Sequence, residues 1–183
     1  IFERKNKIYV GADYFYEEIR KNLFSNYGQD QLFSEGLIVK TSIDTNLQSI
    51  AENSLVNGLV SYDRKMGWRG SLTNLKDTDV SFSYYVKNNI NPFPKNWFMA
   101  KVEKQAENIL HVISQDMTSL EIDLGTNVNK WLINKKFKIG DVIFVEKKDK
   151  IYTIRQIPEA NGAIIIIDPH TGDILAMSGG FSF

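Results

Sequence analysis

The chain has 183 residues, of which 43% are hydrophobic and 12% aromatic, and its 22 Lys and Arg balance 22 Asp and Glu. This composition suffices for a packed core and excludes a disordered chain. The zero formal charge argues against a nucleic-acid partner, and the absence of cysteine excludes a disulfide scaffold, a Cys-ligated zinc site and a thiol nucleophile.

The sequence contains neither a membrane span nor a signal peptide. No apolar run reaches the roughly 18 to 20 residues that cross a bilayer, and the opening stretch IFERKNKIYV lacks an apolar signal core. We therefore expect a soluble fragment, with any anchor or export signal of a parent protein upstream of it.

The first predicted element is a helix with one narrow apolar stripe. It runs from Asp13, a suitable cap, to about Tyr27, and Gly28 stands where a C-terminal stop is expected. The stripe consists of Phe15, Ile19 and Leu23.

A β-rich segment, GLIVKTSI at positions 36–43, precedes a second predicted helix. Asp44 occupies the N-cap position of that helix, and small residues on one face allow close packing. That face consists of Leu47, Ile50, Ala51, Ser54, Gly58, Leu59 and Tyr62. The helix is expected to end in residues 62–70, where two glycines flank Trp68 and Arg69 in an ordered loop.

The middle of the chain changes from helical to β-rich patterns. A helix is indicated near residues 78–87, and NPFP at positions 91–94 excludes helix, so we place a domain boundary in this region. Five strands follow, predicted at 97–102, 109–114, 119–124, 142–147 and 151–156. The longest gap holds Trp131-Leu132-Ile133, interpreted as a plug or short helix over a small barrel. The strand count and spacing are typical of an OB-type barrel, although SH3-like barrels give similar patterns.

The C-terminal stretch GAIIIIDPHTGDILAMSGG is predicted to form a β-hairpin. Ile164–Ile167 has no polar residue, so as a strand it would need cover on both faces. DPHTG at positions 168–172 has the residues of a tight turn, and Ile174–Met177 is the returning strand. Because a lone hairpin cannot bury both of its faces, we interpret it as the edge of a domain that lies outside this chain.

No motif indicates an active site. His111 and His170 lack partners at metal-ligand spacing and are assigned to a half-exposed strand and an exposed turn. Neither Gly-x-Ser-x-Gly nor Ser-x-x-Lys occurs, and Gly179-Gly180 is too short to bind a phosphate. We therefore predict no catalytic residue, no metal and no cofactor.

Charged residues are interpreted as solvated surface. The carboxylate pairs Glu17-Glu18 and Glu121-x-Asp123 fall on predicted solvent faces. Basic clusters occur in NKKFK at 134–138 and KKDK at 147–150. Residues 97–157 hold ten Lys or Arg against eight Asp or Glu, an excess of about +2 that is far from a nucleic-acid footprint.

Three segments together resemble class A penicillin-binding proteins of the 1A type, the bifunctional peptidoglycan synthases. The first, DYFYEEIRKNLFSNYGQDQLFSEGLIVKTSIDTNLQSIAENSL, is similar to the family's linker into its transpeptidase domain. The second, LVSYDRKMGWRG, precedes an inserted OB-like domain in the family. The third, RQIPEANGAIIIIDPHTGDILAMSGGFSF, is similar to the first two strands of the transpeptidase sheet.

The resemblance implies a non-catalytic middle fragment with an α+β fold, mainly β with flanking helices. Its domains would be 1–70, linker and start of the transpeptidase domain, 71–157, a five-stranded OB-like barrel, and 158–183, the first transpeptidase hairpin. In the family a Ser-x-x-Lys motif follows this hairpin, and the glycosyltransferase domain and membrane anchor precede the linker. Both active sites would therefore lie outside this sequence.

The family motif positions imply structural roles for Asp44, Tyr62, Asp63, Gly67, Trp68, Arg69, Gly70, Asp168, Gly172, Gly179 and Gly180. The partners expected from the resemblance are the rest of the synthase chain and envelope activators or other wall-synthesis proteins, at the periplasmic face of the cytoplasmic membrane. The competing interpretation is a free-standing OB-type module that binds oligosaccharide or single-stranded nucleic acid.

Overall fold

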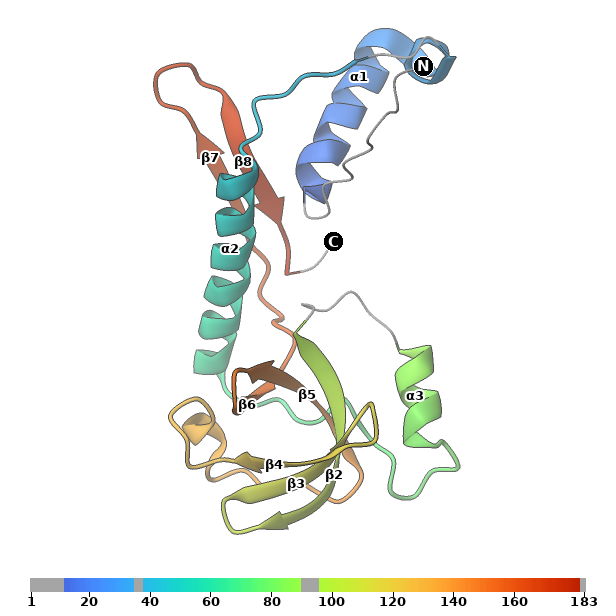
Figure 1. The fold of residues 1–183 in the computed structure, drawn as a ribbon, viewed down its shortest axis with the longest axis vertical. Coiled ribbons are helices and arrows are strands. Elements are labelled where there is room, and N and C mark those ends of the chain that lie inside the picture. The colour runs from blue at the N-terminus through green and yellow to red at the C-terminus, as the bar shows by residue number, and fades with distance from the viewer. Residues whose placement is uncertain (1–11, 35–37, 90–95, 182–183) are drawn as a thin grey trace. The chain divides into compact units, whose positions relative to one another are not determined.

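The computed structural model describes residues 12–34, 38–89 and 96–181 (Figure 1). Its residue contacts divide the chain into two compact units. The sheet unit is Tyr62–Pro158, and the hairpin unit combines the described residues up to Ser61 with Glu159–Phe181. The chain therefore enters and leaves the sheet unit through the hairpin unit.

The fold is mixed, with helices and antiparallel sheets, as predicted. The helical elements are α1 (Asp13–Ser34), α2 (Thr45–Met66), α3 (Phe82–Asn88) and the 3-10 turn η1 (Lys130–Leu132). The strands are β1 (Thr73–Asn74), β2 (Trp97–Ala106), β3 (Ile109–Ser114), β4 (Ser119–Asp123), β5 (Asp141–Lys148), β6 (Ile151–Arg155), β7 (Ala163–Ile167) and β8 (Ile174–Gly179).

The sheet unit contains one curved antiparallel sheet in the order β1-β5-β2-β3-β4, with β6 paired to β5 (Figure 1). β2, β3 and β4 form a meander, whereas β5 returns to the other side of β2, with Ala100 opposite Ile143. The five predicted strands are confirmed, and the short edge strand β1 was not anticipated.

The predicted five-stranded OB-like barrel is not confirmed. Within the described part of the chain no ladder joins β4 to β6, and the sheet is open there. The side chain of Asn129, fully buried, lies in this opening. Its Nδ2 donates to the carbonyls of Asp123, at the end of β4, and Tyr152, in β6, at 3.1 and 2.8 Å. Its Oδ1 accepts from the Ile154 amide at 3.0 Å, so one side-chain amide replaces a strand ladder.

The core of the sheet unit comes from alternate strand positions. β3 alternates between half-buried and buried residues, with Leu110 and Val112 facing inward. Val102, Ile122, Val145 and Ile154 complete the buried layer from the neighbouring strands. Leu132 from η1 is fully buried against them, which confirms the predicted plug.

The first predicted helix is confirmed in its start and in its stop. It begins at Asp13, which lies in its first turn, and its backbone leaves helical geometry at Gly28 (φ 74°), where the stop was predicted. A second helical stretch, which the sequence did not predict, continues beyond this kink to Ser34.

The segment before α2 is extended but does not form a strand over residues 38–43; positions 36 and 37 lie outside the described residues. Ser42 Oγ donates to the Ile174 carbonyl at 2.8 Å, and the Asp44 amide donates to Leu175 at 2.8 Å. The segment is thus held against β8 by isolated hydrogen bonds. Its β-rich composition predicted a strand because composition does not show whether a segment forms a continuous ladder of backbone hydrogen bonds or only a few of them.

The predicted N-cap of α2 is confirmed, because Asp44 Oδ1 accepts from the amides of Asn46 and Leu47 at 2.8 and 3.0 Å. The predicted apolar face is only partly right. Ala51 and Leu59 are buried, whereas the side chains of Ile50 and Tyr62 are 57% and 55% exposed. The helix ends at Met66, within the predicted range 62–70.

The predicted helix near residues 78–87 is confirmed in shorter form as α3, with Ser81 accepting from the Tyr84 amide at 3.3 Å. The NPFP boundary sequence lies outside the described residues. The C-terminal hairpin is confirmed as β7 and β8, with Ile165 opposite Met177. Ile165 and Ile167 are each 53% exposed, so the cover that the sequence predicts for this strand is incomplete in the described residues.

Candidate functional site

A hydrogen-bonded cluster joins the first residues of the sheet unit to its last. Asp63, near the end of α2, is 3% exposed. Its Oδ1 accepts from Arg69 Nη1 and its Oδ2 from Gln156 Nε2, both at 2.7 Å. Gln156 also donates to the Gly67 carbonyl at 2.8 Å and accepts from the Arg69 amide at 3.2 Å. We call these four residues, Asp63, Gly67, Arg69 and Gln156, the clasp.

Local sequence positions the clasp. The backbone leaves α2 at Gly67 with φ 97°, a conformation that side chains disfavour, and its amide donates to the Arg64 carbonyl at 3.1 Å. The chain then reverses, so that Arg69 returns to the carboxylate of Asp63. Arg69 Nη2 also donates to the Ile157 carbonyl at 2.6 Å. One arginine therefore contacts both chain ends of the unit.

Next to the clasp, Trp68 belongs to an aromatic cluster. Its ring lies edge-on to Trp131, with centroids 5.9 Å apart, and packs against Phe137 at 5.5 Å. Both partners come from the connection between β4 and β5. The predicted ordered loop is thus held by an apolar anchor on one side and by the clasp on the other.

Arg64 contributes a half-buried cation to the same cluster. Its guanidinium carbon lies 5.7 Å from the centre of the Trp131 ring. Its Nε and Nη2 atoms and the Trp131 Nε1 are buried, and none of the three has a hydrogen-bond acceptor among the described residues. Burial, with repulsion from Arg155, lowers the pKa of Arg64 to about 10.

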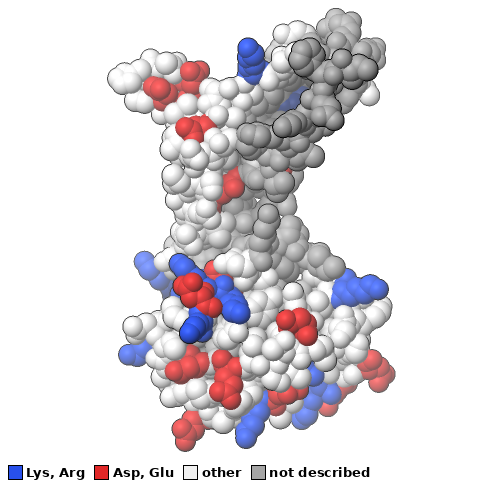
Figure 2. Space-filling model, in the orientation of Figure 1, with Lys and Arg blue, Asp and Glu red and all other residues white. Residues whose placement is uncertain are grey.

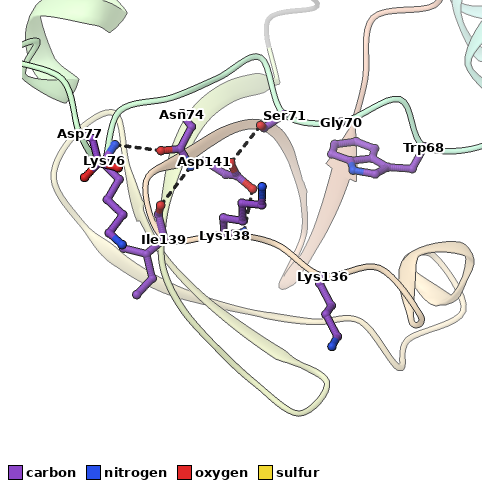
Figure 3. A pocket seen from close by; sticks show the side chains of 10 residues that line it. All are labelled: Trp68, Gly70, Ser71, Asn74, Lys76, Asp77, Lys136, Lys138, Ile139 and Asp141. Atoms are coloured by element: carbon purple, nitrogen blue, oxygen red, sulfur yellow. Dashed lines mark hydrogen bonds between the residues drawn. The ribbon is translucent and has the colours of Figure 1, made fainter.

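A pocket of about 780 Å³ opens on the sheet unit beside Trp68 (Figure 3). Its wall combines the segment after the clasp with the loop before β5. The lining residues are Trp68, Gly70, Ser71, Asn74, Lys76, Asp77, Lys136, Lys138, Ile139 and Asp141.

Asp141 organises the pocket wall and is 8% exposed. Its Oδ1 accepts from Ser71 Oγ at 3.1 Å and Asn74 Nδ2 at 2.8 Å, and its Oδ2 accepts from the Lys138 amide at 2.8 Å (Figure 3). Asn74 Oδ1 in turn accepts from the Lys76 amide at 2.9 Å. This network links the edge strand β1 to β5.

Five of the predicted motif residues lie in the hairpin unit: Asp44, Asp168, Gly172, Gly179 and Gly180. Asp168 Oδ1 accepts from the His170 amide at 2.8 Å in the β7–β8 turn, and the Gly172 amide donates to the Asp168 carbonyl at 2.9 Å. Gly179 lies against Tyr14, where an added Cβ would approach the ring to 3.1 Å. The Gly180 amide donates to Gly162 at 2.7 Å. Tyr62 is exposed and Gly70 lines the pocket.

The histidine and carboxylate interpretations agree with the structure. His111 is half-buried and lies 3.4 Å from Glu121, while His170 is exposed in its turn. Glu17 is hydrogen-bonded to Arg20, which lowers the pKa of its carboxyl. Across the described ranges no group of three or more potential metal-ligating side chains is found, and no helix has the length and apolarity to cross a membrane.

Basic side chains do not form one continuous patch on the face of the sheet unit that Figure 2 shows. On the face seen in Figure 2, lysine and arginine are interspersed with aspartate and glutamate. The KKDK cluster lies at the β5–β6 turn and the NKKFK cluster in the loop before β5. Only the latter reaches the pocket, through Lys136 and Lys138.

Sequence reasoning missed Gln156, Asn129 and Asp141. Each of the three is a polar residue next to or within an apolar pattern, and a polar residue in such a place is normally predicted to lie at the surface. Their burial is the only property that reveals their role, and it depends on partners distant in the sequence, such as Asp63 for Gln156.

No family model matches the chain. Comparison with individual proteins is informative: the chain is 32% identical to penicillin-binding protein 1A of Rickettsia prowazekii over 182 residues, 95% of its own length. It is 25% identical to penicillin-binding protein 1A of Vibrio cholerae over 97% of its length. The chain is a homologue of part of penicillin-binding protein 1A. It spans 23% and 24% of the lengths of these two relatives.

The fold comparison agrees. The crystal structure of penicillin-binding protein 1A from Haemophilus influenzae superposes with a TM-score of 0.75 over 93% of this chain and 26% of that one, at 22% identity. The chain therefore shares the fold of a region of penicillin-binding protein 1A, and the predicted resemblance is confirmed.

Proposed function

We propose that this chain is the non-catalytic middle region of a bifunctional penicillin-binding protein that polymerises and cross-links peptidoglycan in cell wall synthesis. In this proposal the sheet unit is a spacer or protein-docking module. The observation that carries it is the clasp, because Asp63 holds the entering segment to the leaving segment through Arg69 and Gln156. A module whose two chain ends are hydrogen-bonded together can be inserted into a host domain without disturbing it.

We assign residues 71–157 to an OB-like domain, 1–70 to the linker and start of the transpeptidase domain, and 158–183 to its first hairpin. The strand order supports an OB-like assignment, since a meander of three strands is followed by a hairpin whose first strand pairs with the first meander strand. In an OB barrel the last strand would also pair with the third, the place that Asn129 occupies here.

The motif residues have structural roles in this proposal, and both active sites lie elsewhere in the full synthase. The site of action would be the periplasmic face of the cytoplasmic membrane. A free-standing OB module is not favoured, because relatives match 95% of the chain, including the segments on both sides of the sheet unit.

Domain replacement tests the proposal. In the full-length synthase, residues 71–157 would be replaced by a short flexible linker or by an unrelated domain of similar size. We expect both purified proteins to retain glycan polymerisation and penicillin acylation. Loss of acylation in both would contradict a non-catalytic role. Rescue of growth by the unrelated domain alone would identify a spacer, and failure of both would identify a docking module.

A further inference from the structure

Three cationic side chains line the pocket beside Trp68. Lys76, Lys136 and Lys138 all line it, and none of them forms an ion pair among the described residues. Asp77 and the buried Asp141 are its acidic residues, so three lysines face two carboxylates and the local net charge is +1. Asp141 is already committed to the hydrogen bonds that build the wall.

The hydrogen-bond donors that line the pocket indicate which kind of anion it could bind. A tightly held phosphate is usually bound by backbone amides in a nest or at a helix N-terminus. Here the Lys76 amide donates to Asn74, the Lys138 amide to Asp141, and the Leu75 amide to the Gly140 carbonyl. These three amides are already occupied, so they form no phosphate nest, and the side-chain ammonium groups supply mobile point charges at separate positions around the opening.

Separate cations and an apolar wall favour a ligand with separate carboxylates and an apolar body. Trp68 and Ile139 supply the apolar surface. The volume of about 780 Å³ lies within the range of small-ligand sites, which extends from about 300 to 1,000 Å³. A short acidic peptide has this chemistry.

We propose that this pocket binds a short peptide that carries at least two separated carboxylates, and that its source is the peptide stem of the wall polymer. The source rests on the proposed function, whereas the peptide chemistry rests on the pocket. Binding here would hold a stem at the surface of the sheet unit.

The test is a binding titration on the 183-residue chain, followed by ¹H–¹⁵N NMR. The probes are a synthetic stem tetrapeptide with free carboxylates, the same peptide with its carboxylates amidated, and tetraglutamate. We expect the free stem to bind with a Kd of about 1 mM, more weakly as salt is raised. The indole signal of Trp68 should shift, and that of Trp97, buried against Phe144, should not.

Two triple variants provide the comparison. Lys76→Gln, Lys136→Gln and Lys138→Gln together should weaken stem binding by about ten-fold or more, since each exposed ion pair contributes up to about five-fold. Lys87→Gln, Lys148→Gln and Lys150→Gln change the same net charge at exposed positions outside the pocket and should retain binding. All six lysines are exposed, so neither variant threatens the fold.

The inference is overturned if the free stem does not bind, if the amidated stem binds equally well, or if both triple variants weaken binding alike. Tetraglutamate binding as tightly as the stem would overturn the assigned source. These results leave the proposed function standing, because domain replacement in the full synthase tests that function independently.

Discussion

The carboxylate of Asp63 accepts a 2.7 Å hydrogen bond from the side-chain amide of Gln156, 93 positions further along the chain. Both residues are buried, at 3% and 9% exposure. A contact of this sequence separation closes the whole sheet unit, so its loss should affect the unit as one cooperative body.

Replacing Asp63 with alanine should lower the free energy of unfolding of the sheet unit by about 2–4 kcal/mol, because Arg69 and Gln156 would lose their acceptor. Urea unfolding followed by tryptophan fluorescence measures this, since all three tryptophans lie in residues 62–158. Glu17→Ala, which removes the surface pair with Arg20, is the control and should change little. An Asp63→Ala effect below about 1 kcal/mol would contradict the role of the clasp.

Replacing Asn129 with aspartate should destabilise the sheet unit by about 2–3 kcal/mol despite the equal size of the side chain. The change removes the donor to the Asp123 and Tyr152 carbonyls and buries a carboxylate in its place. Hydrogen exchange at the Ile154 amide should become faster. Asn134→Asp, at an exposed position, is the matched control. Unchanged exchange at Ile154 would show that Asn129 does not hold the open edge of the sheet.

Replacing Arg64 with methionine should leave the sheet unit equally stable or stabilise it by about 1 kcal/mol, after allowance for solvent screening. The guanidinium is partly buried, its Nε and Nη2 have no acceptor within the described part of the chain, and its pKa is lowered to about 10. Methionine keeps an unbranched apolar stem against Trp131.

The pH dependence follows from the sign of that shift. From about pH 10 upward the unfolded chain, whose Arg64 has the higher ordinary pKa of an exposed guanidinium, binds more protons than the folded chain. The stability of the wild type therefore rises with pH in this range relative to the variant. The advantage of Arg64→Met should therefore be complete below about pH 10 and shrink above it. Thermal unfolding of both proteins at several pH values checks this. A destabilised variant at neutral pH would refute the prediction.

Two glycine-to-alanine changes in the hairpin unit should have opposite effects on its free energy of unfolding. At Gly179 an added Cβ would lie 3.1 Å from the Tyr14 ring, so Gly179→Ala should loosen α1 from β8 and cost about 1–3 kcal/mol. At Gly58, in the interior of α2, nothing lies within 4 Å, and Gly58→Ala should stabilise the helix by about 0.5–1 kcal/mol. Hydrogen exchange of the amides in α1 and α2 reports both effects. The same sign for the two changes would contradict this packing.

Local patterns in the sequence were enough to locate most elements. Asp44 predicted a helix start because a side-chain cap acts over three residues, and the runs of β2 to β6 predicted strands because alternation is local to each strand. The DPHTG turn and the plug at Leu132 follow from equally local chemistry. The family resemblance also needed only the order of three segments.

Tertiary structure alone decided how these elements close and what becomes buried. Whether the five strands close into a barrel depends on whether β4 and β6 pair through backbone hydrogen bonds. Here the side-chain amide of Asn129 bonds to both sides in place of that pairing. Asp63, Asp141 and Gln156 are polar residues that a sequence pattern assigns to the surface. They are buried because their donors and acceptors arrive from residues as far as 93 positions away, and a hydrogen bond between such residues leaves no periodicity in the sequence.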